Sequence, residues 1–383
     1  MTWDLTGFGA VASVGSDPEE IFASLCAGRS GLAPLRAFDP DNYRARRAYE
    51  IDDRNGAHDE PLRATKWLET AIAQALADAG LEENPGRYPV LVGTTLREQR
   101  SVELWWREKT PLEPSALHFG TALRQRFGST RTYTFANACA ASLYALGMAA
   151  DMIDLDLADT VLVAGTDSIA ESAFGLLDRV QNEVPQALRP FERARCGMLM
   201  GEGAVAVVLQ RAGTGTRPVR AVLHGVAMNC DASHPTAPDP QTIAWAVRDA
   251  QRRAHLAPED VDLVMLHGSG TQLNDTAEAS AMSEVFSGAG ADPLLTAIKS
   301  MTGHTLGGSG LLSLIMAALS LRDGVIPPIL GLDDPIEEAA GLRLVRDRST
   351  TAELTTAQVN AFGFGGINAV AIVAKPPADQ EEL

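Results

Sequence analysis

The sequence predicts an α/β protein built from two similar halves. β-rich runs alternate with alanine-rich helical runs along 383 residues, which favours layers of helices against strands that are buried on both faces. The length exceeds one ordinary domain. Residues 211–218 form a Gly/Thr-rich stretch between two β-like runs, which makes them the best internal boundary. We therefore expect an N-terminal half, 1–212, and a C-terminal half, 213–383.

Each element is predicted from its own residues. Strands are expected where β-branched and apolar residues lie between turn residues: Tyr88–Gly93, Thr132–Ala136, Thr160–Ala164, Ala204–Leu209, Val219–Gly225, Leu263–Leu266, Gln358–Phe362 and Ala369–Ala374. Helices are expected where apolar residues recur with helical spacing: Pro18–Ala27, Thr65–Asp78, Ala140–Ile153, Thr242–Ala254, Thr276–Phe286 and Gly308–Leu321. Both halves thus alternate strands and helices and end in a pair of strands.

Charge and cysteine content exclude several classes of protein. The formal net charge of −17 argues against a nucleic-acid partner, because phosphate binding needs concentrated Lys and Arg. The four cysteines include no CxxC pair and no spacing to the histidines that is typical of a metal site. In a chain of this length they indicate reduced thiols in the cytosol. We expect no metal.

No segment of the sequence predicts a membrane or export role. Residues 1–5 lack both a basic start and an apolar run, so we expect no signal peptide. The longest apolar run, Gly310–Leu321, is too short to span a bilayer and is better interpreted as a buried helix. The expectation is a cytoplasmic protein that does not bind membranes.

Cys139 is a candidate nucleophile. The β-like run Thr132–Ala136 meets Asn137-Ala138-Cys139, where a helical pattern begins. A cysteine at such a junction lies near free backbone N–H groups and the positive end of a helix dipole, and both favour the thiolate, the attacking form. Taken alone, a free cysteine is more often a small buried apolar side chain.

Two histidines and a lysine occupy glycine-rich turns beside buried strands. His267 follows the strand pattern 261–266 and precedes Gly268, at the edge of a sheet where ligands enter α/β folds. Lys299 and His304 lie in Lys-Ser-Met-Thr-Gly-His, followed by a second glycine cluster. Each of the three is individually more often structural, but their shared setting favours one active site.

A fourth feature is the turn Gly363-Phe364-Gly365-Gly366 between two β-like runs, preceded by Phe362. Backbone N–H groups in such a turn can form an oxyanion hole. An ordinary turn between paired strands would not need two aromatic residues.

Together these motifs resemble the elongating β-ketoacyl-acyl-carrier-protein synthases, in order and over nearly the whole chain. The matching segments are Leu5–Gly15, Ala27–Gly31, the turn at Cys139, Val163–Asp167, Arg189–Glu192, Met200–Gly203, Thr236–Pro240, His267–Thr271, Lys299–His304 and the Gly-Phe-Gly-Gly turn. The resemblance implies the duplicated thiolase fold, layered α-β-α-β-α with two mixed sheets. It also implies a divergent member, consistent with secondary metabolism.

The resemblance assigns a role to each matched residue. Cys139 would carry the acyl chain, with its own N–H and that of Phe364 forming the oxyanion hole. His267 and His304, as neutral N–H donors, would assist decarboxylation of a malonyl-type thioester, and Lys299 would orient them. Phe364 and Phe362 would gate the cysteine. Ser269 and Thr271 would bind the phosphopantetheine arm of an acyl carrier protein, with no other cofactor.

The resemblance also implies partner proteins, and this sequence departs from the family at several points. It implies a homodimer, or a heterodimer with a homologous subunit. Docking of an acidic carrier protein needs a basic cluster, for which the candidates are Arg63, Lys66, Arg124, Arg126 and Arg189. Many family members carry a glutamate two turns into the helix after the second histidine, whereas Leu311-Leu312-Ser313 holds no acid here. The spans 94–128 and 169–188 are also short.

Three functions remain open at this point. The first is decarboxylative condensation of a Cys139-bound acyl chain with a malonyl-type unit, in fatty-acid or polyketide-type biosynthesis. The second, suggested by the missing acid and short spans, is an acyltransferase or hydrolase on the same fold that decarboxylates nothing. The third is a non-catalytic partner subunit that sets chain length, although such partners typically lack the cysteine that is present here.

Overall fold

A computed structural model of the protein describes residues 2–54, 59–83 and 86–377. Within these residues one sheet of 11 strands dominates the fold. Its order from one edge to the other is β12 (Arg343–Leu344), β10 (Leu294–Thr296), β9 (Leu263–Met265), β14 (Thr356–Gly363), β15 (Ile367–Ala374), β8 (Ala221–Cys230), β1 (Trp3–Ala12), β7 (Gly203–Arg211), β6 (Thr160–Asp167), β4 (Val90–Gly93) and β5 (Thr132–Phe135).

The sheet has two mixed parts that meet at a short seam. Strands from residues 3–211 lie on one side, strands from residues 221–374 lie on the other, and β1 and β8 join them antiparallel over only Trp3–Leu5 and Ala221–Leu223. The predicted mixed α/β fold is confirmed, but the two expected sheets are hydrogen-bonded into one. The division at residue 212 remains a proposal, supported by this separation of the strands.

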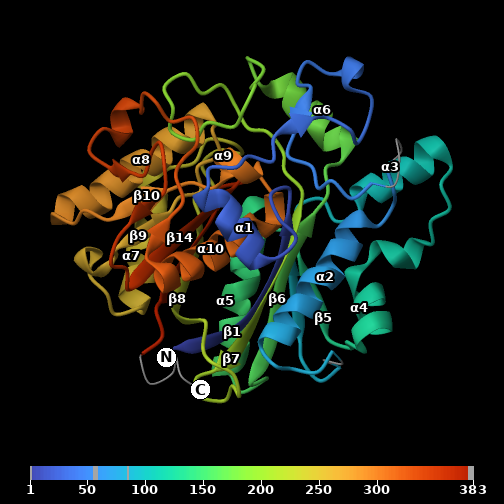
Figure 1. Cartoon of the computed structure of the whole chain (residues 1–383), viewed down its shortest axis with the longest axis horizontal. Helices are drawn as coiled ribbons and strands as arrows, with labels where there is room; N and C mark the ends of the chain where they lie inside the picture. The colour runs from blue at the N-terminus through green and yellow to red at the C-terminus, as the bar shows by residue number, and fades with distance from the viewer. Residues whose placement is uncertain (1, 55–58, 84–85, 378–383) are drawn as a thin grey trace.

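Some helices pack on the outside of the sheet, and others lie between the strands of its two halves. The long ones are α1 (Pro18–Cys26), α2 (Arg63–Asp78), α3 (Gln99–Glu108), α4 (Phe119–Phe127), α5 (Ala141–Asp154), α6 (Glu171–Val180), α7 (Pro240–Arg253), α8 (Gln272–Phe286) and α10 (Ser309–Asp323), and α9 (Lys299–Thr302) is a single turn. Figure 1 shows α5 and α10 between the strands of the two halves, and both helices contact strands of each half. Helix α2 packs outside on β1 and β7, and α7 packs outside on β8. None of the described helices has the length and apolar content needed to cross a membrane.

The core explains these positions. Thirteen consecutive residues of α10, Ser309–Leu321, are buried, which is possible only for a helix enclosed on all sides. Burying this apolar surface is the main favourable term in packing the two halves around it. The predicted buried helix at Gly308–Leu321 is therefore confirmed.

All eight predicted strands and six predicted helices are present, with ends shifted by a few residues. Strand β1 was missed, because Gly7 and Gly9 interrupt its β-like pattern. The structure gives the reason for both glycines: a Cβ would lie 2.1 Å from the Ala75 carbonyl oxygen at Gly7 and 1.9 Å from that of Ala71 at Gly9. They let α2 lie directly on the strand. Helices α3, α4 and α6 and strands β10 and β12 were also missed.

Two short hairpin-like pairs complete the structure. Strand β2 (Ala33–Pro34) pairs with β3 (Arg47–Ala48), and β11 (Val325–Ile326) pairs with β13 (Thr350–Thr351). Strand β5 pairs only with β4, so its other side is an open edge of the large sheet within the described residues. Tyr133 on this strand is 47% exposed.

Candidate active site

Segments from both halves converge on one small pocket. Its lining includes Cys139 from the N-terminal half and, from the C-terminal half, seven of the predicted site residues and their neighbours: His267, Ser269, Thr271, His304, Phe362, Gly363 and Phe364. Lys299 lies directly behind His267. The structure therefore brings the sequence motifs together, although they are separated by more than 200 residues along the chain.

Cys139 lies on the strained turn between β5 and α5. Ala138 has a φ of +49°, a left-handed conformation that is costly for a residue with a Cβ. A short 3₁₀ turn, Ala138–Ala140, then leads into α5. The turn places the thiol in the pocket with only 8% of the residue exposed.

The N–H groups at this junction favour the thiolate, as expected, but burial of the thiol has the larger effect on its pKa. Burial raises the pKa of the Cys139 thiol to about 12, and this outweighs the opposing effects of Lys299 and of the backbone N–H groups of Cys139 and Phe364, which point at the sulfur. The resting nucleophile is therefore a neutral thiol. The same two N–H groups are those that the oxyanion-hole prediction named.

The two predicted histidines lie edge to face beside the cysteine. Their ring centroids are 5.2 Å apart and both side chains are buried. The Leu306 N–H donates to His304 Nδ1 at 3.1 Å, which leaves the proton of the neutral ring on Nε2. That Nε2 is buried without a hydrogen-bond partner in the described structure.

Both imidazoles rest in the neutral form. Burial, followed by the charge of Lys299, lowers the pKa of His267 and that of His304 well below the usual value. A neutral imidazole can donate a hydrogen bond to a developing oxyanion without giving up a full proton. The Nε2–H of His304, which has no partner in the described structure, can therefore donate a hydrogen bond to an oxygen atom of a substrate.

Lys299 holds His267 from behind. Its ammonium donates to the His267 carbonyl oxygen and lies 3.4 Å from His267 Nδ1. Burial lowers the pKa of Lys299 to about 8, although nearby Glu278 and Cys139 raise it. In the described structure the hydrogen bonds of its ammonium reach His267 only, and the orienting role of Lys299 stays a prediction.

A buried acid that the sequence analysis did not single out binds the backbone beside His267. Glu278 on α8 accepts hydrogen bonds from the backbone N–H of His267 at 2.7 Å and of Gly268 at 2.8 Å, and from Asn360 Nδ2 at 3.0 Å. Burial raises its pKa to about 7. This acid binds the turn of His267, whereas Leu311-Leu312-Ser313 of α10, in the helix after His304, holds no acid, as the sequence indicated. The position of Glu278 eleven residues after His267, on a predicted helix, was the available signal.

Asp167, at the end of β6, is a second buried acid whose role the sequence did not reveal. Its carboxylate accepts from Thr94 Oγ1, from the N–H groups of Thr95 and Leu96, and from the Gly307 N–H at 2.7 Å. Burial raises its pKa to about 6. It ties the loop after β4 to the loop that carries His304.

The entrance to the pocket carries the hydroxyl residues and the glycine-rich turn. Ser269 Oγ and Thr271 Oγ1 lie 2.9 Å apart on the pocket wall. Phe364 is 49% exposed at the mouth, while Phe362 is buried against His267 with ring centroids 5.9 Å apart. Gly365 donates its N–H to the Pro235 carbonyl oxygen at 2.8 Å, so a second loop supports the turn.

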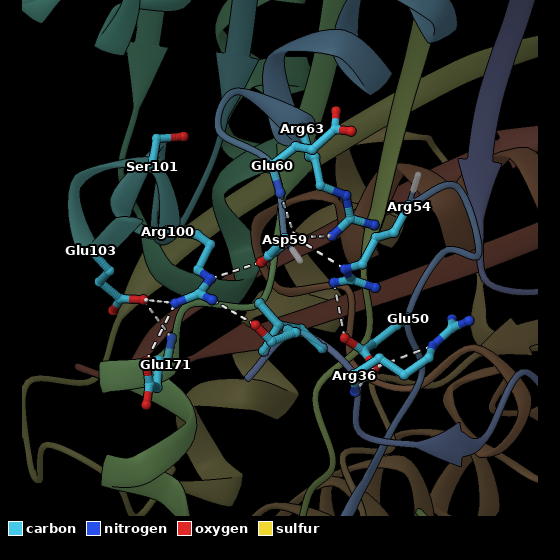
Figure 2. Close-up of polar contacts among 12 residues, drawn as sticks. Arg36, Glu50, Arg54, Asp59, Glu60, Arg63, Arg100, Ser101, Glu103 and Glu171 are labelled. Carbon is cyan, nitrogen blue, oxygen red and sulfur yellow. Dashed lines mark hydrogen bonds and ion pairs between the residues drawn. The ribbon is translucent and has the colours of Figure 1, made fainter. Parts of the chain in front are cut away.

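One predicted docking residue is wrong. Arg63 is 4% exposed, and its guanidinium binds Glu202, Asp53 and Asp59, so it cannot reach a carrier protein. Figure 2 shows Asp59 among Arg54, Arg63 and Arg100 inside the protein. Four predicted docking residues are exposed: Lys66, Arg124, Arg126 and Arg189. Among the described residues no group of three or more His, Cys, Asp or Glu could hold a metal ion.

Two family models match this chain. The N-terminal domain model of beta-ketoacyl synthases matches residues 5–214, and the C-terminal domain model matches residues 220–333. A 3-oxoacyl-acyl-carrier-protein synthase 2 from Vibrio cholerae is 30% identical over 95% of this chain and 96% of that protein. The ketoacyl synthase alpha subunit of the tetracenomycin polyketide synthase from Streptomyces glaucescens is 30% identical over 97% of this chain and 96% of its own length.

A solved structure extends the similarity to three dimensions. The ishigamide ketosynthase/chain length factor superposes with a TM-score of 0.88 at 31% identity, covering 98% of this chain and 99% of the other. A β-ketoacyl synthase from Burkholderia phymatum has the same fold, with a TM-score of 0.85 at 24% identity.

Proposed function

Since this chain belongs to the β-ketoacyl synthase family, we propose that it joins an acyl chain held on Cys139 to a malonyl-type unit by decarboxylative Claisen condensation. It is an acyltransferase of the β-ketoacyl-acyl-carrier-protein synthase type. The observation that carries the proposal is the buried, unpartnered Nε2 of His304 beside His267 in the pocket of Cys139.

The first half-reaction loads the cysteine. The Cys139 sulfur attacks the carbonyl carbon of an acyl thioester, and the carrier thiol leaves with the proton that the cysteine gives up. The negative charge on the carbonyl oxygen is stabilised by the N–H groups of Cys139 and Phe364, which already point at the sulfur. Because burial raises the pKa of this thiol to about 12, the thiol must give up its proton as the sulfur attacks.

The second half-reaction forms the carbon–carbon bond. The bond between the malonyl carboxylate and its α-carbon breaks, carbon dioxide leaves, and the electron pair becomes an enolate. The N–H groups of the neutral His267 and His304 donate to the enolate oxygen. The enolate carbon then attacks the Cys139 thioester, and the cysteine leaves as the product β-ketoacyl thioester forms.

We propose that an acyl carrier protein delivers the substrate, because the relative from Vibrio cholerae is named a 3-oxoacyl-acyl-carrier-protein synthase. We propose that the hydroxyl groups of Ser269 and Thr271 bind the phosphopantetheine arm, since both line the pocket entrance. No other cofactor is proposed. Lys66, Arg124, Arg126 and Arg189 are the proposed docking residues, because each is exposed and positively charged.

We propose a dimer, formed with a second copy or with a homologous subunit, through the open edge of β5. A solved relative is described as a ketosynthase/chain length factor, which supports the heterodimer.

A cytoplasmic location is proposed from the four cysteines, which are all free. The non-decarboxylating acyltransferase or hydrolase remains the second candidate, because Leu311-Leu312-Ser313 in the helix after His304 holds no acid.

Intact-mass measurement tests the loading step. Incubation with acylated carrier proteins should add one acyl group, mapped to Cys139, and Cys139→Ala should remain unmodified. Cys26→Ala, at a half-buried cysteine on α1, should acylate like the wild type. Acylation of Cys139→Ala at the wild-type level would contradict the proposed nucleophile.

A further inference from the structure

We propose that Glu202, paired with Arg63, is a positioning residue for His304. The inference rests on the function proposed above and adds to it a buried charge pair, neither member of which lines the pocket of Cys139.

The backbone of His304 is held by one short segment. The His304 N–H donates to the Leu199 carbonyl oxygen at 3.0 Å, and the Gly201 N–H donates to the His304 carbonyl oxygen at 2.9 Å. Both polar backbone groups of the histidine are therefore bound to residues 199–201. The position of the imidazole depends on where this segment lies.

Glu202 follows that segment directly and fixes it. Its N–H donates to the Tyr49 carbonyl oxygen at 2.9 Å. Its fully buried carboxylate accepts from the Ile51 N–H at 3.0 Å and from the Ile169 N–H at 3.3 Å. Glu202 thus joins the segment through its backbone to Tyr49, and through its side chain to Ile51 and to Ile169, two residues beyond Asp167 at the end of β6.

Arg63 stabilises the buried carboxylate of Glu202 by pairing with its charge. Its Nη1 and Nη2 donate to the two oxygens of Glu202 at 2.9 and 3.0 Å, a bidentate pair that fixes orientation as well as charge. Arg63 is held in turn by Asp53, by Asp59 and by the Ile51 carbonyl oxygen, and its guanidinium lies 4.4 Å from the Trp67 ring centroid. A buried charge needs such partners, because water is excluded from it.

The pair of Glu202 and Arg63 therefore affects the decarboxylation half-reaction and not the loading of Cys139. None of the hydrogen bonds of Glu202 in the described structure reaches the turn of Cys139. Loosening the pair displaces the His304 Nε2–H, which serves decarboxylation, and leaves the loading of Cys139 unaffected. A displacement of about 1 Å in such a donor costs on the order of a hundredfold in rate.

The test compares two half-reactions in Glu202→Gln and in Arg63→Lys, which keeps the charge but loses the bidentate geometry. Acyl loading of Cys139 is followed by intact mass, and carbon dioxide release is measured with malonyl carrier protein. We expect release to fall about tenfold to a hundredfold while loading stays within about twofold of the wild type. Thermal unfolding curves give the fraction of each variant that is folded at the assay temperature, and each rate is divided by that fraction.

Arg100→Gln is the matched control. Arg100 is equally buried and belongs to the same network, but its contacts are Asp59, Glu103, Glu171 and the Ala37 carbonyl oxygen (Figure 2). We expect it to lower stability without changing the ratio of the two rates. Equal losses in both half-reactions of the Glu202 and Arg63 variants, or the same selective loss in Arg100→Gln, would overturn the positioning role. If the wild type itself releases no carbon dioxide, the proposed function fails instead.

Discussion

At the scale of single residues, burial decides the chemistry of the site. The Cys139 thiol, the two imidazoles and Lys299 all rest nearer their neutral forms than they would in water, because the pocket excludes solvent from each of them. Neutral groups are what the proposed reaction needs from the histidines. The cysteine, in contrast, must lose its proton during each cycle.

The raised pKa of Cys139 predicts how its reactivity changes with pH. Thiolate is the reacting form, and the pKa is about 12. The rate of Cys139 alkylation by iodoacetamide should therefore rise about tenfold for each pH unit between pH 7 and pH 9, without levelling off. Peptide mapping of the labelled protein measures it. A plateau near neutral pH would show a stabilised thiolate and contradict the account.

Glu278 predicts a pH dependence of stability. Its pKa is about 7 in the folded protein and near the ordinary 4.5 when unfolded, so between these values the folded state binds more protons. Stability from this group is therefore lost as pH rises from about 4.5 to 7. Glu278→Gln removes the effect, and the free energy of unfolding of the wild type, relative to the variant, should fall by about 3 kcal/mol between pH 4.5 and 7.5.

Urea unfolding at the two pH values checks this difference. The exposed Glu113 offers a control, since Glu113→Gln should leave the pH dependence of the wild type unchanged. A wild-type curve that runs parallel to that of Glu278→Gln would mean that folding does not raise the pKa of this carboxyl group.

At the scale of elements, the turn between β14 and β15 shows how backbone geometry serves the site. Gly365 and Gly366 both have positive φ, at 88° and 74°, so alanine is strained at either position. They differ in the space available. A Cβ at Gly366 would lie 1.9 Å from Asp231 Oδ1, whereas at Gly365 the nearest atoms are 3.8 Å away.

This difference predicts that Gly366→Ala slows acyl loading of Cys139 more than Gly365→Ala does. The two variants share the conformational cost, about 1 kcal/mol, and only the first must displace Asp231 and move the turn that carries Phe364. Single-turnover acylation by intact mass gives both rates. Equal rates for the two variants would show that the Asp231 contact does not hold the turn.

Elements also show what the sequence could and could not predict. A strand–helix junction pointed to Cys139, and glycine-rich turns after apolar runs pointed to His267, Lys299 and His304, because such junctions and turns are local features of the sequence. Arg63 was misjudged and Glu278 was missed, because the burial of a charged residue depends on partners far along the chain, such as Glu202 and Asn360. The same limit applies to β1, whose glycines only make sense beside α2.

At the scale of the whole molecule, the open edge of β5 predicts a dimer formed by strand pairing. The carbonyl oxygens of Arg131 and Phe135 accept from Val90 and Thr94, so in this parallel ladder the alternate Thr134 directs its N–H to the open side. Unpaired edge groups of this kind are templates for another strand.

Thr134→Pro should therefore give a monomer, because proline removes the outward N–H without removing a bond to β4. Thr134→Val keeps the N–H and should remain dimeric. Light scattering of both variants at micromolar concentration measures the mass. A dimeric Thr134→Pro protein would place the interface elsewhere.

The wild-type reaction with malonyl carrier protein tests the central claim most directly. After Cys139 is loaded with an acyl group, carbon dioxide release should match the formation of β-ketoacyl product one for one, and His304→Ala should lower both together. Loading of Cys139 without any carbon dioxide release would contradict decarboxylative condensation and would favour a plain acyltransferase.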